Sequence, residues 1–257
     1  MNKDLIQWHK KSSISHGMSD VIIPNVDDTK VLGISRLNLE KNEKYIINYE
    51  TEEINALITK GSAEVTFDGK TNLLEKLDSF YSPSKNEIQI KALEELSIYI
   101  GKAPCENVGE AFVRKINFEL PIGDIHQIHG EGSGRREVMF TLAPQDKASR
   151  LICGITWSAD GAWTSWPPHQ HEKDLEEAYC YFDIESYGLH FSYLTSENFS
   201  NAVCHIVENG SVVVAPVGYH PTCAIPGSKN IYFWVLAAMN QESRRYDLAK
   251  NDPEFDV

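Results

Sequence analysis

The sequence predicts an all-β protein made of two fused β-barrels. Three observations favour this fold class: short β-rich segments recur along the 257 residues, turn residues separate them, and the two halves of the chain share a weak repeat. Long stretches with a helical spacing of apolar residues are absent. Many short strands with frequent turns are typical of β-sandwiches and barrels. At about 150 residues per domain, the length allows one or two domains.

The expected strands are rich in Val, Ile, Tyr and Phe, and several alternate apolar and polar residues, as Ile-Gln-Ile-Lys at 88–91 does. Turns such as Asp68-Gly69 and Asp160-Gly161 separate them. Residues 1–11 and 243–250 are expected to form short terminal helices. In chain order, the expected strands are residues 45–48, 54–58, 63–67, 88–91, 97–101, 151–157, 178–182, 189–193, 211–214 and 231–236.

The internal repeat aligns two strand starts that carry adjacent glutamates. Glu53 in the first half aligns with Glu177 in the second, and Glu87 aligns with His220 in a later segment. Chance similarity among β segments is the alternative interpretation. We predict a duplicated barrel, with residues 1–110 in the first copy and residues 111–257 in the second.

Composition limits the partners and the compartment. The chain has 24 Lys and Arg against 37 Asp and Glu, a net charge of −13, which disfavours nucleic acid and anionic membranes as partners but not a small anionic substrate. The first 17 residues contain no apolar block long enough for a signal peptide. Five cysteines without a CxxC pair indicate reduced thiols. We therefore expect a cytoplasmic protein.

Histidines distinguish the two halves, because none occurs from Gly17 through Ile125. In the second half, His169 and His171 are spaced to share one face of a strand. A Glu-Glu pair opens the next expected strand, and His220 follows much later, directly before a proline. Three imidazoles and a carboxylate suit one borderline divalent metal ion, with positions left for water or substrate. The first barrel would then lack a working metal site.

These motifs resemble the 5-deoxy-glucuronate isomerase family, which is related to the 4-deoxy-5-hexosulose-uronate ketol-isomerases. The resemblance covers most of the chain and is carried by residues 161–172, the Leu-Glu-Glu-Ala-Tyr run at 175–179, the segment 214–221 and Asn251-Asp252-Pro253. It implies a bicupin, that is, two tandem double-stranded β-helix (jelly-roll) barrels. It also implies that His169, His171, Glu177 and His220 bind the metal. Glu176 is the alternative to Glu177, since a shift of one residue reverses the face of a strand.

The resemblance further implies a metal-dependent aldose–ketose isomerase that converts 5-deoxy-glucuronate to 5-dehydro-2-deoxy-gluconate, or acts on a close relative. A divalent ion stabilises the developing oxyanion in such a reaction. Glu177 and Tyr219 are the expected catalytic residues. The general base stays open among Glu176, Glu172, Asp174, Tyr181, Tyr219 and His205, and a hydride shift would need none at the carbon.

An arginine turn supplies the expected anion contact. Arg135 and Arg136 follow a Gly-Ser-Gly turn, and guanidinium groups bind carboxylate, phosphate or sulfonate bidentately. The family carries a similar arginine here, and Arg136 is the preferred residue; a solvated surface pair is the alternative. Lys173 and Trp166 are further expected substrate contacts.

Two departures from the family pattern leave the substrate open. The loop between His171 and the glutamate pair is short, and Val138-Met139-Phe140 stands where the family typically has a histidine. A 6-sulfonated glucose, with sulfoquinovose converted to 6-deoxy-6-sulfofructose, is one alternative substrate. A non-catalytic cupin that binds sugar or metal is the alternative from another class. The metal could be Zn, Mn, Fe, Co or Ni, and a homo-oligomer built on the first barrel is an expectation.

Overall fold

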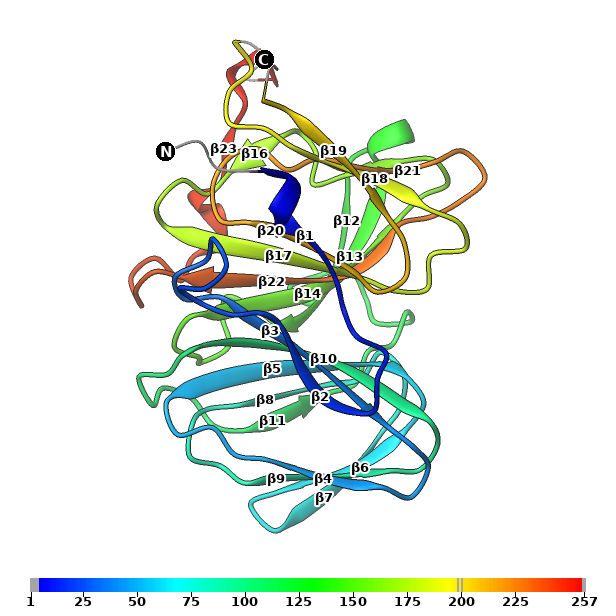
Figure 1. Ribbon diagram of the computed structural model, residues 1–257, viewed down its shortest axis with the longest axis vertical. Helices are drawn as coiled ribbons and strands as arrows, with labels where there is room; N and C mark the ends of the chain where they lie inside the picture. Colours follow the sequence, from blue (N-terminus) through cyan, green and yellow to red (C-terminus); the bar gives the residue numbers. More distant parts are fainter. Residues whose placement is uncertain (1–4, 198, 200, 256–257) are drawn as a thin grey trace.

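The computed structural model describes residues 5–197, 199 and 201–255 as two stacked β-barrels (Figure 1). In the first barrel, a six-stranded sheet in the order β11-β8-β5-β10-β3-β2 faces a four-stranded sheet in the order β4-β9-β6-β7. Its strands are β2 (Gly17–Ile22), β3 (Gly33–Leu39), β4 (Lys44–Ile47), β5 (Glu52–Lys60), β6 (Ala63–Phe67), β7 (Lys70–Leu74), β8 (Ser79–Ser82), β9 (Ile88–Ala92), β10 (Leu96–Pro104) and β11 (Phe112–Arg114).

The second barrel pairs a seven-stranded sheet, in the order β1-β20-β17-β22-β14-β13-β12, with a four-stranded sheet in the order β15-β21-β18-β19; β16 and β23 form a separate two-stranded ladder. Its strands are β1 (His9–Lys11), β12 (His126–His129), β13 (Arg136–Leu142), β14 (Leu151–Ser158), β15 (Trp163–Thr164), β16 (His169–Gln170), β17 (Leu175–Tyr181), β18 (Gly188–Ser192), β19 (Val203–Val207), β20 (Ser211–Ala215), β21 (Thr222–Ala224), β22 (Ile231–Ala238) and β23 (Lys250–Asn251). Four short 3-10 helices complete the described chain: η1 (Leu5–Trp8), η2 (Gly132–Gly134), η3 (Tyr246–Leu248) and η4 (Pro253–Phe255).

The all-β bicupin prediction is confirmed, and every strand expected from the sequence overlaps an observed strand. The terminal helices are wrong: residues 9–11 are a strand, and residues 5–8 and 246–248 form only 3-10 turns. Residues 1–4 of the first expected helix lie outside the described residues. The physical reason is that His9–Lys11 pairs with β20 as the outermost strand of this sheet and takes its backbone hydrogen bonds there.

Strand pairing crosses the predicted division at residue 110 in both directions. β1 belongs to a sheet of the second barrel, whereas β11, which begins at residue 112, pairs with β8 in the first. Each barrel therefore includes a strand from the other side of that division. The boundary itself stays a prediction.

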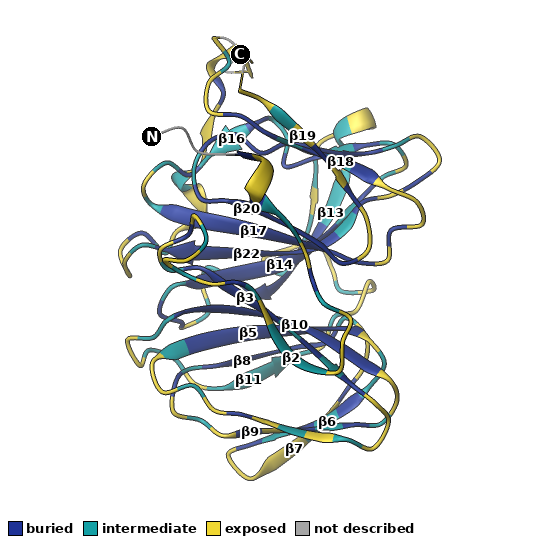
Figure 2. Ribbon diagram, viewed as in Figure 1, coloured by how far each residue is buried: buried dark blue, intermediate teal, exposed yellow. Residues whose placement is uncertain are grey.

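The two large sheets pack against each other and share a core. Leu57 and Tyr99 from the first barrel and Cys153 and Val235 from the second belong to one buried cluster, and Figure 2 shows the facing sheets in the colour of buried residues. Gly101 on β10 permits this close approach, because a Cβ there would lie 2.7 Å from Cγ1 of Val235. Separate apolar clusters fill the interior of each barrel.

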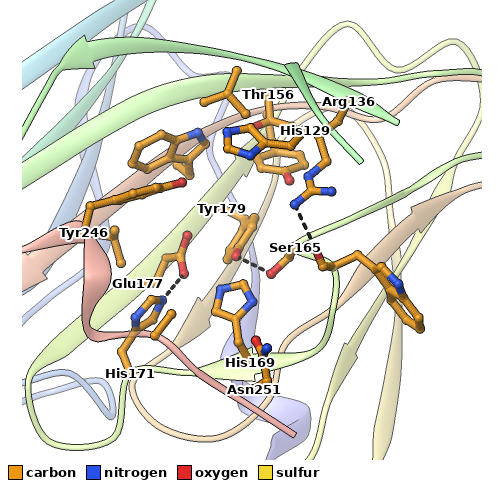
Figure 3. Close-up of a pocket in the computed structure, with 16 residues that line it drawn as sticks. His129, Arg136, Thr156, Ser165, His169, His171, Glu177, Tyr179, Tyr246 and Asn251 are labelled. Atoms are coloured by element: carbon orange, nitrogen blue, oxygen red, sulfur yellow. Dashed lines mark hydrogen bonds and ion pairs between the residues drawn. The ribbon is translucent and has the colours of Figure 1, made fainter. Parts of the chain in front are cut away.

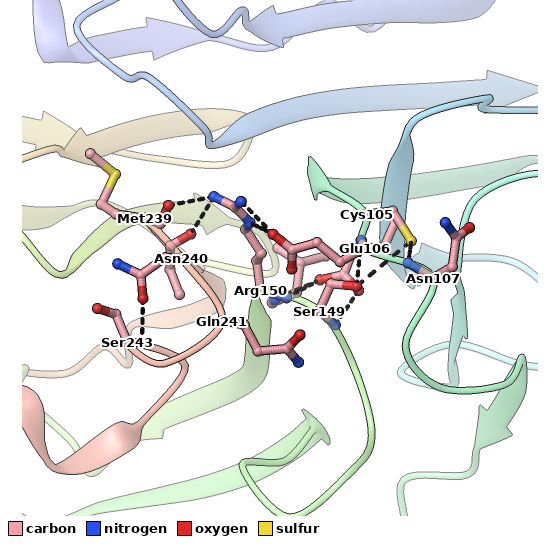
Figure 4. A network of polar contacts seen from close by, with 12 residues as sticks. Cys105, Glu106, Asn107, Ser149, Arg150, Met239, Asn240, Gln241 and Ser243 are labelled. Carbon is pink, nitrogen blue, oxygen red and sulfur yellow. Dashed lines mark hydrogen bonds and ion pairs between the residues drawn. The ribbon is translucent and has the colours of Figure 1, made fainter.

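The junction between the barrels is also polar at one edge. Arg150 donates to the carboxylate of Glu106 and to the backbone carbonyl of Met239, and the Ser149 hydroxyl accepts from the Glu106 amide at 2.9 Å (Figure 4). This network ties the segment after β10 to the start of β14. Within the described part of the chain, no helix is long and apolar enough to cross a membrane.

The repeat is real, but its predicted register is wrong by one residue. β5 and β17 are equivalent strands, each lying between the partners β8 and β10 or β20 and β22. Glu53 lies opposite Ala103, and Glu176 lies opposite the equivalent Ala237. Glu53 is thus the counterpart of Glu176, not of Glu177. Glu87, aligned with His220, is exposed and accepts a hydrogen bond from Gln89.

Candidate metal centre

Four side chains gather at one end of the second barrel. His169 lies on β16, His171 directly after it, Glu177 on β17, and His220 in the turn before β21. One potential ligand atom from each lies within 4.8 Å of the others. His171, Glu177 and His220 are buried, and His169 is partly so. The residues of the sequence motif therefore lie close together in space, as Figure 3 shows for His169, His171 and Glu177.

Backbone carbonyls fix the orientation of two of these imidazoles. Nδ1 of His169 donates to the carbonyl of Pro167 at 3.0 Å, and Nδ1 of His220 donates to the carbonyl of Gly218 at 2.9 Å. A carbonyl can only accept, so both rings carry their proton on Nδ1 and leave Nε2 for the centre of the cluster. Second partners of this kind are usual for histidines that bind a metal.

The donor set fits a divalent cation. Nε2 of His171 and Nε2 of His220 each lie 3.1 Å from the same oxygen of Glu177, and Nε2 of His220 is buried without a hydrogen-bond partner among the described residues. Burial, followed by the neighbouring histidines, lowers the pKa of His169 to about 3, so this ring is neutral at pH 7. Burial opposes ionisation of Glu177, but the adjacent imidazoles of His171 and His220 hold its pKa well below the usual range. Neutral imidazoles and a carboxylate are ligands for a borderline ion.

Glu177, rather than Glu176, faces this cluster. Glu176 points to the other side of β17, where its carboxylate accepts the backbone N–H groups of Lys30, Val31 and Leu32 at 2.8 to 3.1 Å. The choice between the two glutamates thus follows from the alternation of the strand.

A cavity of about 210 Å³ opens beside the four residues. Its walls are largely aromatic and carry a few polar groups. Figure 3 shows Arg136 and His129 at the end of the pocket opposite His171. The aromatic wall consists of Trp166, Tyr179, Tyr232, Trp234 and Tyr246, and the remaining polar lining residues are Thr156, Ser165 and Asn251.

Arg136 is the positive group of this pocket. Its guanidinium donates to the carbonyls of Trp166 at 2.7 Å and Gly134 at 3.0 Å, and it forms no ion pair with a described carboxylate. Burial lowers its pKa, but an arginine stays charged at neutral pH. A half-buried cation without a counter-ion can bind an anion that enters the pocket.

His129 lies near Arg136 and is the lining imidazole outside the four-residue cluster. Burial and then the charge of Arg136 lower its pKa, so the ring is neutral at pH 7. Its Nε2 forms a hydrogen bond of 2.8 Å with the side-chain oxygen of Gln127, which makes Nε2 the donor and leaves Nδ1 able to accept a proton.

Three residues expected at the substrate lie outside the pocket. Arg135 is exposed and sits 3.8 Å from Glu137, and Lys173 is exposed in the turn before β17. Tyr219 lies behind the metal-binding segment, where its hydroxyl accepts from Gln170, the residue between the two histidines. Because side chains alternate along a strand, Gln170 points away from the four-residue cluster. Tyr219, which is hydrogen-bonded to Gln170, therefore lies on the side away from the cluster as well.

The other candidates for a general base are engaged elsewhere. Glu172 pairs with Lys250, Asp174 accepts from Ser243, Tyr181 bonds His190 inside the barrel, and His205 bonds Ser192. None of these four lines the cavity.

Sequence reasoning missed His129, Tyr246 and Asn251. His129 lies on β12, a strand of only four residues that pairs with β13. So short a strand carries no clear alternation of apolar and polar residues in the sequence, so His129 does not stand out. Tyr246 and Asn251 reach the pocket because the end of the chain folds back over it, which no local spacing reveals. The Asn-Asp-Pro motif was the available signal for Asn251.

Comparisons with known proteins agree with this architecture. The 5-deoxy-glucuronate isomerase of Geobacillus kaustophilus is 27% identical over 69% of this chain, and the match spans 64% of that relative, slightly under two thirds of its length. The 5-deoxy-glucuronate isomerase of Halalkalibacterium halodurans is 26% identical over 91% of this chain and 92% of its own.

Solved structures show the same fold. An IolB-like protein from Salmonella typhimurium LT2 superposes with a TM-score of 0.79 at 22% identity, covering 91% of this chain and 93% of that one. A cupin 2 conserved barrel domain protein from Leptotrichia buccalis gives a TM-score of 0.51 at 14% identity, over 86% and 88% of the two chains. The sequence model of the KduI/IolB family matches residues 8–257. The chain therefore belongs to the KduI/IolB family.

Proposed function

We propose that the protein is a metal-dependent aldose–ketose isomerase acting on an anionic hexose derivative, namely 5-deoxy-glucuronate or a close relative. One observation carries this proposal: His169, His171 and Glu177 of the three-histidine, one-carboxylate cluster line the same cavity of about 210 Å³ as Arg136, an arginine without a described counter-ion. The names of the relatives support the same class of reaction.

His169, His171, Glu177 and His220 would hold the ion. When bound, a divalent ion supplies Lewis acidity to the carbonyl and the neighbouring hydroxyl of the sugar. The chain's own residues do the rest: Arg136 binds the acidic group, the aromatic wall limits access of water, and together they orient the carbon chain along the pocket. The reaction moves one hydrogen from C2 to C1 and one proton from the C2 hydroxyl to the C1 oxygen, so the aldehyde carbon is reduced while C2 is oxidised, and no external oxidant is required.

Proton transfer would use His129. A hydrogen removed from C2 as a proton needs a base that is neutral at working pH, and Nδ1 of His129 meets that condition in the pocket. Deuterium from heavy water in the product at C1 would support this route. Complete retention of the substrate hydrogen would instead indicate a hydride shift, which leaves His129 without that task.

The test combines metal analysis with an isomerase assay on a panel of uronates, deoxy-uronates and sulfo-sugars. The proposal expects a divalent metal near one equivalent and turnover of at least one acidic sugar. His169→Ala and His220→Ala should each remove both, whereas His16→Ala, which changes an exposed histidine of the first barrel, should remove neither. A fully metallated protein that converts no sugar in the panel would favour the non-catalytic binding cupin.

A 6-sulfonated glucose is the second candidate substrate. Val138 lines the pocket close to the arginine turn, so an apolar side chain occupies the stretch where the family resemblance leads one to expect a histidine. An arginine can bind a tetrahedral sulfonate as well as a carboxylate. A higher kcat/KM for sulfoquinovose than for 5-deoxy-glucuronate would favour this candidate.

A further inference from the structure

The end of the chain forms one wall of the pocket. Residues 244–252, which we call the C-terminal strap, follow β22 and return across the mouth of the second barrel to pair with β16. In the register of that pairing, Asn251 lies opposite His169. Tyr246, Ala249 and Asn251 all line the cavity.

Arg244 anchors the start of the strap. Its guanidinium donates to four backbone carbonyls, those of Leu151, Pro144, Asp146 and Ala143, at distances of 2.8 to 3.0 Å. A rigid planar group that satisfies four carbonyls leaves the chain little freedom at this point.

Asp252 anchors the other end and is fully buried. Its carboxylate accepts the hydroxyl of Tyr193 at 2.8 Å and the backbone N–H of Glu254 at 3.2 Å, and its own N–H donates to the carbonyl of Pro168 at 2.8 Å. Next to it, Phe255 packs edge-on against Trp166, with ring centroids 5.0 Å apart. The strap is thus fixed directly beside the segment that carries His169.

Two polar groups between these anchors have no described partner. The ring of Tyr246 packs edge-on against Phe140, with centroids 5.2 Å apart, and Figure 3 shows its hydroxyl pointing into the pocket. The side-chain amide of Asn251 lies beside His169 in the same view. No described residue forms a hydrogen bond with either group. A phenol and an amide, each able to donate and accept, match the hydroxyls of a sugar.

We propose that the C-terminal strap recognises the hydroxyl groups of the sugar, through the amide of Asn251 and the hydroxyl of Tyr246, and that Asp252 is the positioning residue that holds them there. This proposal rests on the proposed function for the identity of the ligand as a sugar acid. It assigns the acidic group to Arg136 and the hydroxyls to the strap, which divides recognition between two segments more than 100 residues apart in sequence.

The direct test compares Asn251→Ala and Tyr246→Phe with Asp247→Ala, which alters an exposed ion pair of the strap with Arg245. Loss of one neutral hydrogen bond weakens binding by about 3- to 10-fold. We therefore expect KM for the sugar acid to rise by that factor in the first two variants, with metal content unchanged, and to stay at the wild-type value in Asp247→Ala. Wild-type KM in both Asn251→Ala and Tyr246→Phe would overturn the proposal.

Asp252 is tested by a readout that does not need turnover. Asp252→Ala should release the strap and speed tryptic cleavage after the exposed Lys250, and Asp252→Asn, which keeps a hydrogen-bonding group, should restore part of the protection. KM should rise in parallel with cleavage. Faster cleavage with an unchanged KM would contradict a role of the strap in recognition.

A binding titration separates this proposal from the proposed function. D-glucuronate is added to the metal-loaded protein while the fluorescence of the tryptophans, two of which line the pocket, is recorded. Binding that Asn251→Ala weakens, without turnover of any sugar, would overturn the isomerase and uphold the strap. Turnover of the sugar acid that is unchanged in both strap variants would uphold the isomerase and overturn the role of the strap in recognition. A wild-type protein that binds no sugar would also overturn that role.

Discussion

Glu53 and Glu176 occupy equivalent positions in the two barrels, and each binds backbone N–H groups of the other barrel. Glu53 accepts from Ser149, Arg150 and Leu151 at 2.6 to 2.7 Å, directly at the start of β14. Glu176 accepts from residues 30–32 directly before β3, which is the counterpart of β14. Both carboxylates are buried. Each barrel thus supplies one buried glutamate that binds the backbone at or directly before the start of the equivalent strand of the other barrel.

The first prediction separates the two adjacent glutamates. Glu176→Ala leaves the backbone N–H groups of Lys30, Val31 and the buried Leu32 without this acceptor and should lower the free energy of unfolding by roughly 1 to 3 kcal/mol, with metal binding retained. Glu177→Ala should instead abolish metal binding. Denaturant titration and metal analysis of both variants provide the check, and loss of metal in Glu176→Ala alone would reverse the assignment.

A second prediction concerns the close approach of β10 and β22. Gly101→Ala puts a Cβ within 2.7 Å of Val235 and should destabilise the protein by about 1 to 3 kcal/mol through overpacking. Val235→Ala removes the opposing methyl groups, so the double variant should be more stable than the sum of the single effects predicts. Additive effects in this double-mutant cycle would mean that the two residues do not clash.

Arg136 and Arg135 should differ sharply in their effect on substrate binding. A charged hydrogen-bonded contact contributes about 1.5 to 3 kcal/mol, so Arg136→Ala should raise KM for an acidic sugar about 10- to 150-fold. Arg135→Ala, which changes an exposed side chain, should leave KM at the wild-type value. Steady-state kinetics on both variants decide the matter, and equal effects would refute the choice of Arg136.

The fourth prediction is a dependence of stability on pH in the metal-free protein. His190 is fully buried, and burial, followed by the charges of His205 and His220, keeps its pKa well below 6.5. Unfolding exposes the ring, so below about pH 6.5 the unfolded chain binds a proton that the folded chain does not, and stability falls as pH falls. Each such histidine can contribute at most about 1.4 kcal/mol per pH unit to the slope of the free energy of unfolding against pH.

Denaturant titrations at pH 7.5, 6.0 and 5.0 should show this decline, and His190→Gln should reduce its slope whatever its effect on absolute stability. An unchanged slope would show that His190 does not titrate on unfolding.

The strands and the His169–His171 pair could be predicted from the sequence because both depend on short spacings, whereas His220 is assigned through the family resemblance. His169 and His171 share a face by alternation, and β-rich segments between turns predict strands. Tyr219 lies outside the cavity lining, and the sequence could not show this because Tyr219 forms an isolated β-bridge with Tyr193 and belongs to no alternating strand. Glu53 was misaligned because two adjacent glutamates are indistinguishable until pairing with Ala103 and Ala237 fixes the register. Asn251 could not be placed from the sequence because it reaches the pocket only when the C-terminal strap folds back and pairs with β16.

The strand exchange at the two ends of the first barrel bears on how the molecule folds. With β1 paired to β20 and β11 paired to β8, cutting the chain at residue 110 would leave each fragment with an unpaired sheet edge and an uncovered apolar face. We therefore expect that neither half folds on its own. We expect the two barrels to melt in one cooperative transition, with the first barrel acting as a scaffold for the second.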